Sequence, residues 1–143
     1  MKPTYDPNNI FAKILRGEAP CVKVYEDGVS LAFMDVMPRA EGHTLVIPKV
    51  AARNLFDIEP DDLARFMPSV QRVTHAVMAG MKAEGISLMQ FNEEPGGQQV
   101  FHLHFHILPR WTGIPIGPPG GPFQNAEALR PQAERIVAAF ASL

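Results

Sequence analysis

Residues 100–110 read Val100-Phe101-His102-Leu103-His104-Phe105-His106-Ile107-Leu108-Pro109-Arg110. Successive side chains of a strand point to opposite faces, so the alternation predicts a strand over Val100–Leu108. The three histidines would project from one face, with neighbouring imidazoles roughly 6 to 7 Å apart. The apolar residues between them would form the opposite, buried face. The segment therefore predicts a row of imidazoles fixed on a half-buried strand.

Three interpretations of this histidine row are open. A lone histidine is most often a surface or hydrogen-bonded structural side chain, but clustered imidazoles are typical of functional sites. A metal site would need a fourth ligand from His43 or a carboxylate, and three successive strand positions seldom converge on one ion. In nucleophilic catalysis, one neutral imidazole attacks an electrophile while its neighbours hold its tautomer and donate to the developing charge.

The loop before the histidines helps to separate the last two interpretations. It runs from Asn92 to Val100 and contains Gly96-Gly97. By themselves the two glycines are typical of a hairpin turn. They also allow backbone N–H groups to approach an anion closely, which a phosphate requires and a metal ion does not. Next to three histidines, the loop favours a phosphate ligand.

Hydrophobic periodicity along the chain predicts an α+β fold. The pattern gives an antiparallel sheet of about five strands with a long helix and short flanking helices. Pro68 falls inside the long helix and would kink it or break it into two shorter helices. The Pro/Gly-rich segment Gly113–Pro122 should be irregular but stiff, and neither it nor Trp111 can be given a role. The expected strands are Val22–Glu26, Leu31–Val36, Thr44–Ile47, Ile86–Phe91 and Val100–Leu108, and the expected helices are Pro7–Arg16, Asp61–Met81 and a C-terminal helix from Ala126.

Composition limits the class of protein. The chain has 143 residues, of which 46% are apolar, and 13 basic against 15 acidic side chains give a formal charge of -2. This is enough for a single domain, and the low charge argues against a nucleic-acid partner. No apolar run reaches the roughly 20 residues of a membrane span and no signal peptide is evident, so we expect a soluble, cytoplasmic protein without a membrane partner. A single cysteine, Cys21, excludes an internal disulfide.

The histidine pattern resembles that of the histidine triad (HIT) family, particularly its nucleoside phosphoramidate hydrolase branch. The resemblance covers about residues 10–110, the core of a single domain 1–143 that ends with the segment and helix of 112–143. It implies a HIT-like fold. The other matching segments are Ile10-Phe11-Ala12-Lys13-Ile14, Gly17-Glu18-Ala19-Pro20, Val24-Tyr25-Glu26-Asp27, Ala32-Phe33-Met34-Asp35 and Gly42-His43-Thr44-Leu45-Val46-Ile47-Pro48-Lys49.

The resemblance implies nucleotidyl transfer through a covalent histidine. His104 would attack the α-phosphorus of a nucleoside 5'-phosphoramidate or an aminoacyl-adenylate-like substrate, and water would then hydrolyse the nucleotidyl-imidazole. His102 would orient His104, His106 would contact the phosphate, and His43 would lie beside the triad. Imidazole is partly unprotonated near neutral pH and is a good leaving group, so both half-reactions are feasible without a metal.

The resemblance also implies a nucleotide-binding cleft. Phosphate oxygens would accept from backbone N–H groups near Gly97, Gln99 and Val100 and from Asn92, and Asp35 would accept from the ribose hydroxyls. An apolar cleft for a purine base would comprise Phe11, Ile14, Phe33 and Val36. By burial statistics alone, Phe11 and Ile14 would instead be assigned to the core.

Some positions depart from the family pattern. Many members hold a structural zinc through two cysteines, a later histidine and the first triad histidine, but this chain has Asn9, Ala12 and Val50-Ala51-Ala52 at the first three places. We therefore predict no metal and no cofactor. Gln99 stands where a small hydroxyl residue is usual, which leaves proton delivery to the leaving group open.

The resemblance implies a homodimer formed through the long helix and the strand near residues 86–91. Three other functions stay open: hydrolysis of dinucleoside polyphosphates, nucleotide-binding regulation with little catalysis, and metal binding.

Overall fold

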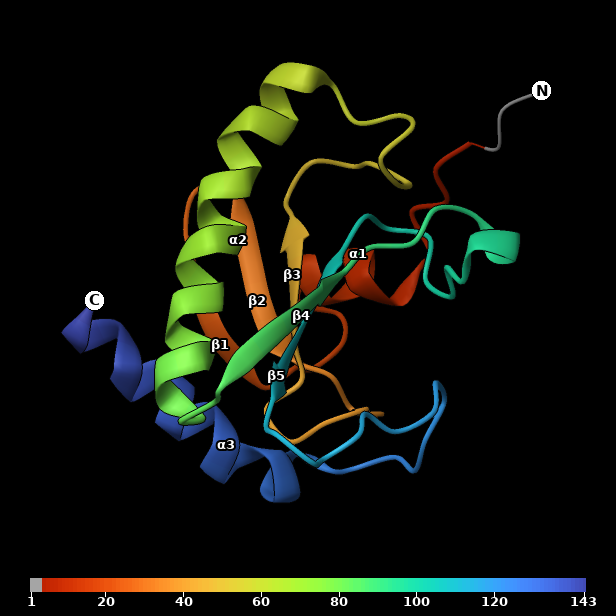
Figure 1. Cartoon of the computed structure of the whole chain (residues 1–143). Coiled ribbons are helices and arrows are strands. Elements are labelled where there is room, and N and C mark those ends of the chain that lie inside the picture. Colours follow the sequence, from red (N-terminus) through yellow and green to blue (C-terminus); the bar gives the residue numbers. More distant parts are fainter. Residues whose placement is uncertain (1–3) are drawn as a thin grey trace.

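Residues 4–143 are described by a computed structural model, in which a five-stranded antiparallel sheet is flanked by three α-helices (Figure 1). The strand order is β1-β2-β3-β5-β4. This architecture confirms the α+β prediction. The elements are α1 (Ile10–Leu15), β1 (Lys23–Glu26), β2 (Ser30–Met34), β3 (Thr44–Pro48), α2 (Pro60–Gly80), β4 (Gly85–Met89), β5 (Phe105–Arg110) and α3 (Ala126–Ala139), with short 3₁₀ turns at Glu94–Gly96 and Phe140–Ser142.

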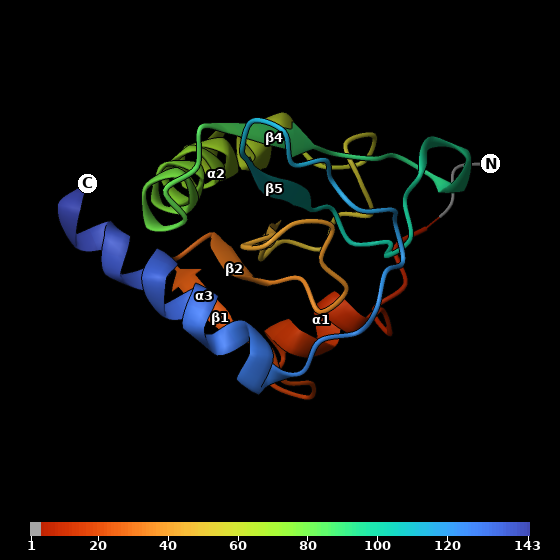
Figure 2. The ribbon, with the colours of Figure 1, turned by 60° about the horizontal axis from the view of Figure 1, so that its bottom comes forward.

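The sheet buries both of its faces. Alternate residues of β2 point to opposite sides, so Ala32 and Met34 pack with α2 and α3 while Leu31 and Phe33 pack with Phe11 of α1. Figure 2 shows α1 and α2 on opposite sides of the sheet. Because both faces are covered there, every residue of β2 and β3 is buried and neither strand alternates between buried and exposed positions.

The long helix α2 runs unbroken through Pro68. Its apolar stripe is buried against the sheet on both sides of the proline, through Phe66, Val70, Val73 and Val77. Four such side chains contribute more than the roughly 3 kcal/mol that an internal proline costs. The alternative of two shorter helices was therefore wrong.

The strand predicted over Val100–Leu108 was wrong in its first half, because β5 begins only at Phe105. The N–H of Leu103 donates to the carbonyl of Ala52 at 2.8 Å instead of to a neighbouring strand. The carbonyl of His102 is occupied by the ring of His104. These two bonds divert the chain from the ladder, so that only His106 lies within the strand.

The Pro/Gly-rich segment lies against the loop between β2 and β3. The N–H of Gly117 donates to the carbonyl of Arg39 at 2.7 Å, and Nε of Arg39 donates to the carbonyl of Gly117 at 3.0 Å. A third bond joins the N–H of Gln124 to the carbonyl of Val36 at 2.7 Å. The segment, for which the sequence offered no role, thus braces the loop that leads to His43.

Gly80 lies where α2 packs closely on α3, so a substitution there tests this packing. A β-carbon on Gly80 would lie 2.7 Å from the carbonyl oxygen of Arg135 and 2.8 Å from Cα of Ile136, both backbone atoms. We expect Gly80→Ala to lower the free energy of unfolding by about 1–3 kcal/mol, measured by urea denaturation. Gly85→Ala is the matched control, since no atom lies within 4 Å of its β-carbon. Equal stability of the two variants would contradict the packing argument.

Candidate active site

Three of the four predicted site histidines come together on the α1 side of the sheet. The ring centroids of His104 and His106 lie 4.9 Å apart, and those of His43 and His106 lie 5.2 Å apart. His106 pairs with Leu45 across β3 and β5, which places both side chains on the same face. The ring of His102 bonds instead to Tyr5 and Pro48. On the opposite face, Leu103 and Ile107 are fully buried and Phe105 is partly buried, which confirms the predicted rear face.

Hydrogen bonding assigns the tautomer of His104. Its Nδ1 lies 2.6 Å from the carbonyl oxygen of His102, which can only accept, so Nδ1 carries the hydrogen. The lone pair therefore stays on Nε2. Burial lowers the pKa of His104 to about 4, against the opposing effect of the bond to His102. At neutral pH the ring is an unprotonated nucleophile.

A chain of hydrogen bonds likewise assigns His43 and His106. The N–H of Arg39 donates to Nδ1 of His43 at 3.0 Å, so Nε2 of His43 carries the hydrogen. That Nε2 lies 3.0 Å from Nδ1 of His106, which must then accept. The hydrogen of His106 therefore sits on Nε2. Burial lowers the pKa of His43 to about 4 and that of His106 to about 3.

His102 uses both of its ring nitrogens within the protein. Nε2 donates to the carbonyl of Pro48 at 2.8 Å, and Nδ1 accepts from the hydroxyl of Tyr5 at 2.6 Å. The side chain is fully buried, and burial lowers its pKa. The first triad histidine is thus a neutral, doubly anchored ring.

The residues do not fit the structural zinc that many family members hold. The Asn9 side chain caps α1 by accepting from the N–H of Ala12 at 2.9 Å, the methyl side chain of Ala12 cannot bind a metal ion, and His102 has no free lone pair on its ring. Asp35, His43 and His106 place one ligand atom each within 4.8 Å of one another, which is the geometry of a possible metal site. However, the 3.0 Å contact between the two rings is a hydrogen bond that an ion would have to break.

Of the predicted base-binding residues, Phe11 lies directly beside His104. The ring of Phe11 meets Phe33 edge-on at 5.3 Å and His104 edge-on at 5.0 Å. Phe11 and Phe33 are buried, Ile14 is partly buried against them, and Val36 is 43% exposed. Phe11 is therefore both a core residue and a neighbour of the triad.

In the predicted phosphate loop, two candidate donors are already engaged. The N–H of Gly97 donates to the carbonyl of Glu94 at 3.0 Å, and Nδ2 of Asn92 donates to Oε1 of Gln90 at 3.0 Å. Within residues 4–143, nothing accepts from the N–H groups of Gln99 and Val100. Among the predicted backbone donors, these two N–H groups are therefore free to donate to an anion.

Gln98, which the sequence did not single out, fixes this loop. Its buried amide donates to the carbonyls of Arg53 at 2.7 Å and Val100 at 3.0 Å. Its oxygen accepts from Asn54 at 3.0 Å and from the N–H of Glu93 at 2.8 Å. All hydrogen-bonding positions of the amide are used, so the loop holds its shape without a ligand. Only its place beside Gly97 could have drawn attention to it.

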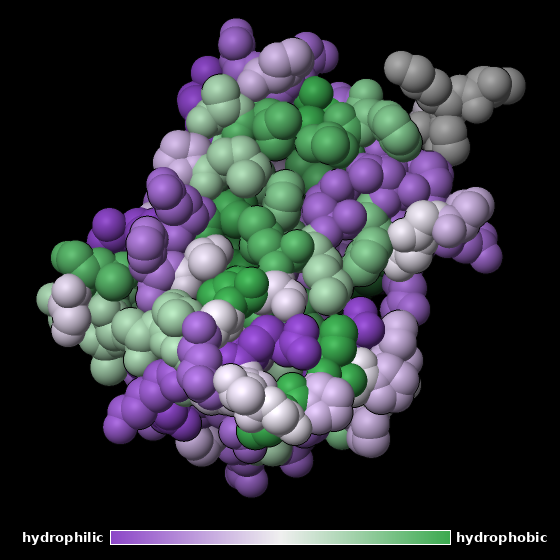
Figure 3. Space-filling view, in the orientation of Figure 1, coloured by the Kyte–Doolittle hydropathy of each residue, from purple (hydrophilic) through white to green (hydrophobic). Residues whose placement is uncertain are grey.

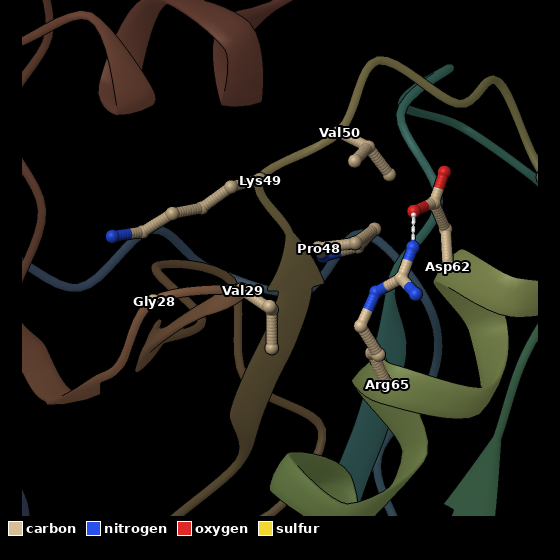
Figure 4. Close-up of a pocket in the computed structure, with 7 residues that line it drawn as sticks. All are labelled: Gly28, Val29, Pro48, Lys49, Val50, Asp62 and Arg65. Carbon is tan, nitrogen blue, oxygen red and sulfur yellow. Dashed lines mark hydrogen bonds and ion pairs between the residues drawn. The ribbon is translucent and has the colours of Figure 1, made fainter.

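One cavity of the structure is lined by no histidine. It has a volume of about 200 Å³ and is surrounded by the β1–β2 turn, the end of β3 and the first turns of α2 (Figure 4). Arg65 is paired with Asp62 at 2.6 Å, and Lys49 is paired with Glu26 at 2.8 Å. The charges of this cavity are thus satisfied within the protein.

Comparisons with known proteins point to one family. The family model of the HIT domain matches residues 16–113. The adenosine 5'-monophosphoramidase of Schizosaccharomyces pombe is 38% identical over 119 residues, covering 76% of this chain and 86% of the relative. An adenylylsulfatase of Arabidopsis thaliana is 37% identical over 101 residues, covering 71% of this chain and 51% of the relative.

Solved structures extend the similarity to nearly the whole chain. A Hit-like protein from Bartonella henselae, described as involved in cell-cycle regulation and crystallised with an unknown ligand, has a TM-score of 0.89 and 48% identity, covering 95% of this chain and 99% of that one. A zinc-bound histidine triad family protein from Mycobacterium smegmatis has a TM-score of 0.80 and 31% identity, covering 94% of each chain. Sequence, fold and site together show that this chain belongs to the histidine triad (HIT) family.

Proposed function

We propose that the protein is a nucleotide hydrolase that cleaves nucleoside 5'-phosphoramidates or aminoacyl-adenylate-like substrates at the α-phosphorus. One observation carries the proposal: the hydrogen bonds leave a lone pair on Nε2 of His104 and a hydrogen on Nε2 of the adjacent His106. A nucleophile beside a donor is the arrangement that attack on a phosphorus centre needs. Relatives named as a phosphoramidase and an adenylylsulfatase support the same chemistry.

The proposed reaction has two half-reactions. Nε2 of His104 bonds to the phosphorus, the phosphorus–nitrogen bond breaks, and the amine leaves with a proton from solvent. His106 and the N–H groups of Gln99 and Val100 donate to the phosphate oxygens as their charge grows. Water then attacks the phosphorus and releases a proton to solvent, the bond to His104 breaks with return of its lone pair, and the nucleoside monophosphate leaves. No step requires a metal ion or a cofactor.

The first test of this function is direct trapping of the intermediate. Wild-type protein mixed with adenosine phosphoramidate and quenched in alkaline denaturant, which preserves a phosphorus–nitrogen bond, should carry an AMP adduct on His104, located by peptide mass spectrometry. Faster turnover of a diadenosine polyphosphate than of the phosphoramidate would favour the dinucleoside polyphosphate alternative. AMP binding without adduct or turnover would show a nucleotide-binding regulator instead.

Asp35 is the proposed ribose-binding residue and gives a second test. Its Oδ1 accepts from the N–H of Met37 at 2.8 Å, its Oδ2 lies 3.3 Å from Nε2 of His43, and burial raises its pKa. We expect Asp35→Ala to raise KM about tenfold for an adenosine phosphoramidate, the cost of losing hydrogen bonds to a charged acceptor. The 2',3'-dideoxy substrate should be almost unaffected.

The exposed Asp61, in the first turn of α2, provides a matched control, and Asp61→Ala should leave both KM values unchanged. Equal losses for the ribose and dideoxy substrates in Asp35→Ala would refute ribose binding. Such a result would mean that Asp35 acts through its contact with His43.

We further propose that two chains assemble as a homodimer through α2 and β4. β4 is an edge strand with one free side, and its Leu88 is 47% exposed. Figure 3 shows apolar side chains gathered over the neighbouring parts of α2 and β4.

No helix within residues 4–143 is long and apolar enough to span a membrane.

A further inference from the structure

The segment before α1 reaches back across the fold to the triad. The hydroxyl of Tyr5 lies 2.6 Å from Nδ1 of His102, and the two rings meet edge-on with centroids 5.5 Å apart. The carbonyl of Thr4 accepts from Arg53 at 3.5 Å, and Asn9 closes the segment as the cap of α1. Residues 4–9 precede residues 16–113, which the HIT family model matches.

The direction of the Tyr5 bond is fixed by the other end of the His102 ring. Nε2 of His102 faces the carbonyl of Pro48 and must donate to it, so Nδ1 holds a lone pair and the Tyr5 hydroxyl is the donor. His102 is 0% exposed, so bulk water has no access to replace the hydroxyl. Loss of the hydroxyl would leave a buried acceptor without a partner.

We propose that Tyr5 is a positioning residue for the nucleophile. It anchors the His102 ring at Nδ1 while Pro48 anchors it at Nε2, and the ring held at both ends fixes the peptide of the same residue. The carbonyl of that peptide accepts from Nδ1 of His104 at 2.6 Å and so sets the tautomer and direction of the attacking ring. Tyr5 thus occupies the ring nitrogen of His102 that Pro48 leaves free. Its kinetic consequence rests on the proposed function, whereas its effect on His102 does not.

Tyr5→Phe tests the proposal because it keeps the ring and removes only the hydroxyl. We expect kcat for adenosine phosphoramidate to fall about tenfold with KM within about twofold of the wild type, the effect of one lost hydrogen bond. In ¹⁵N NMR without substrate, the Nδ1 resonance of His102 should move to the position of an unbonded ring nitrogen. Tyr25→Phe is the matched control, since its hydroxyl bonds to Asp27 at 2.8 Å and its ring packs with the α2 and α3 cluster on the other face.

An unchanged Nδ1 resonance in Tyr5→Phe would overturn the proposal, as would equal losses of kcat in the two variants or a change confined to KM. If the wild type lacks phosphoramidase activity, the proposed function fails while the NMR measurement still decides whether Tyr5 holds His102. Should Tyr5→Phe not fold, 3-fluorotyrosine incorporated into Tyr25→Phe keeps both ring and hydroxyl. The altered acidity of its hydroxyl should then shift the His102 Nδ1 resonance, and no shift would reject the contact.

Discussion

His104→Ala is expected to reduce kcat for adenosine phosphoramidate by on the order of 10⁴-fold and to abolish the AMP adduct. The variant removes Nε2 of His104, which among the four site histidines is the ring nitrogen whose lone pair accepts no hydrogen bond. Nearby rings cannot substitute, because His43 and His102 use both ring nitrogens in hydrogen bonds. Steady-state kinetics and intact-protein mass spectrometry measure the two effects.

The control for this variant is His75→Ala, since His75 lies exposed on α2, away from the triad. It should retain wild-type kcat and form the adduct normally. AMP affinity of His104→Ala, measured by calorimetry, should change far less than kcat. Retention of turnover in His104→Ala would rule out the covalent mechanism and leave direct attack by water.

The second large expected effect is a loss of folding stability as the pH falls. The pKa values of His43 and His104 are lowered to about 4 and that of His106 to about 3, in each case chiefly by burial. An unfolded histidine titrates near 6.5, so below that pH the unfolded chain binds more protons than the folded one. The stability is fully present above about pH 6.5 and is lost as pH falls toward 4. We expect the free energy of unfolding to be lower by several kcal/mol at about pH 5 than at about pH 7.

Urea denaturation at about pH 7 and about pH 5 measures this loss of stability, and the other shifted groups can be distinguished from the histidines. Burial raises the pKa of Asp27, but hydrogen bonds from Ser69, Val29 and other donors outweigh it and lower the value to about 2, so its contribution is lost only below about pH 4. Burial raises the pKa of Asp35, which acts in the opposite direction. His75→Gln should leave the difference between pH 7 and pH 5 intact. Equal stability at both values would mean that the buried rings are not held neutral.

The fold could be predicted largely from local patterns. Alternation correctly placed Leu103 and Ile107 on the face opposite His106, and periodicity found all three helices and five strands. Errors arose where tertiary contacts overrode the local pattern. β5 starts late because the backbone bonds of residues 102 and 103 go to His104 and Ala52 instead of to β3, a choice that alternation does not encode.

The candidate site could be predicted from the sequence only in part. Four histidines could be named from their spacing and from family resemblance, but their tautomers depend on Arg39, Pro48 and Tyr5. Tyr5 lies 97 positions from its partner, and no periodic signal links two residues so far apart. Gln98 could not be predicted either, because nothing in the sequence indicates that its amide holds the loop through the carbonyl of Arg53.

The hydrogen bonds between Gly117 and Arg39 show that the geometry of the site depends on residues far from the histidines in the sequence. Arg39 directs its N–H at His43, so the segment after β5 is connected to a triad neighbour through one residue. Tyr5 makes the corresponding connection from the other end. The shortest fragment able to keep every ring in its assigned state therefore extends on both sides beyond residues 16–113, which the family model matches.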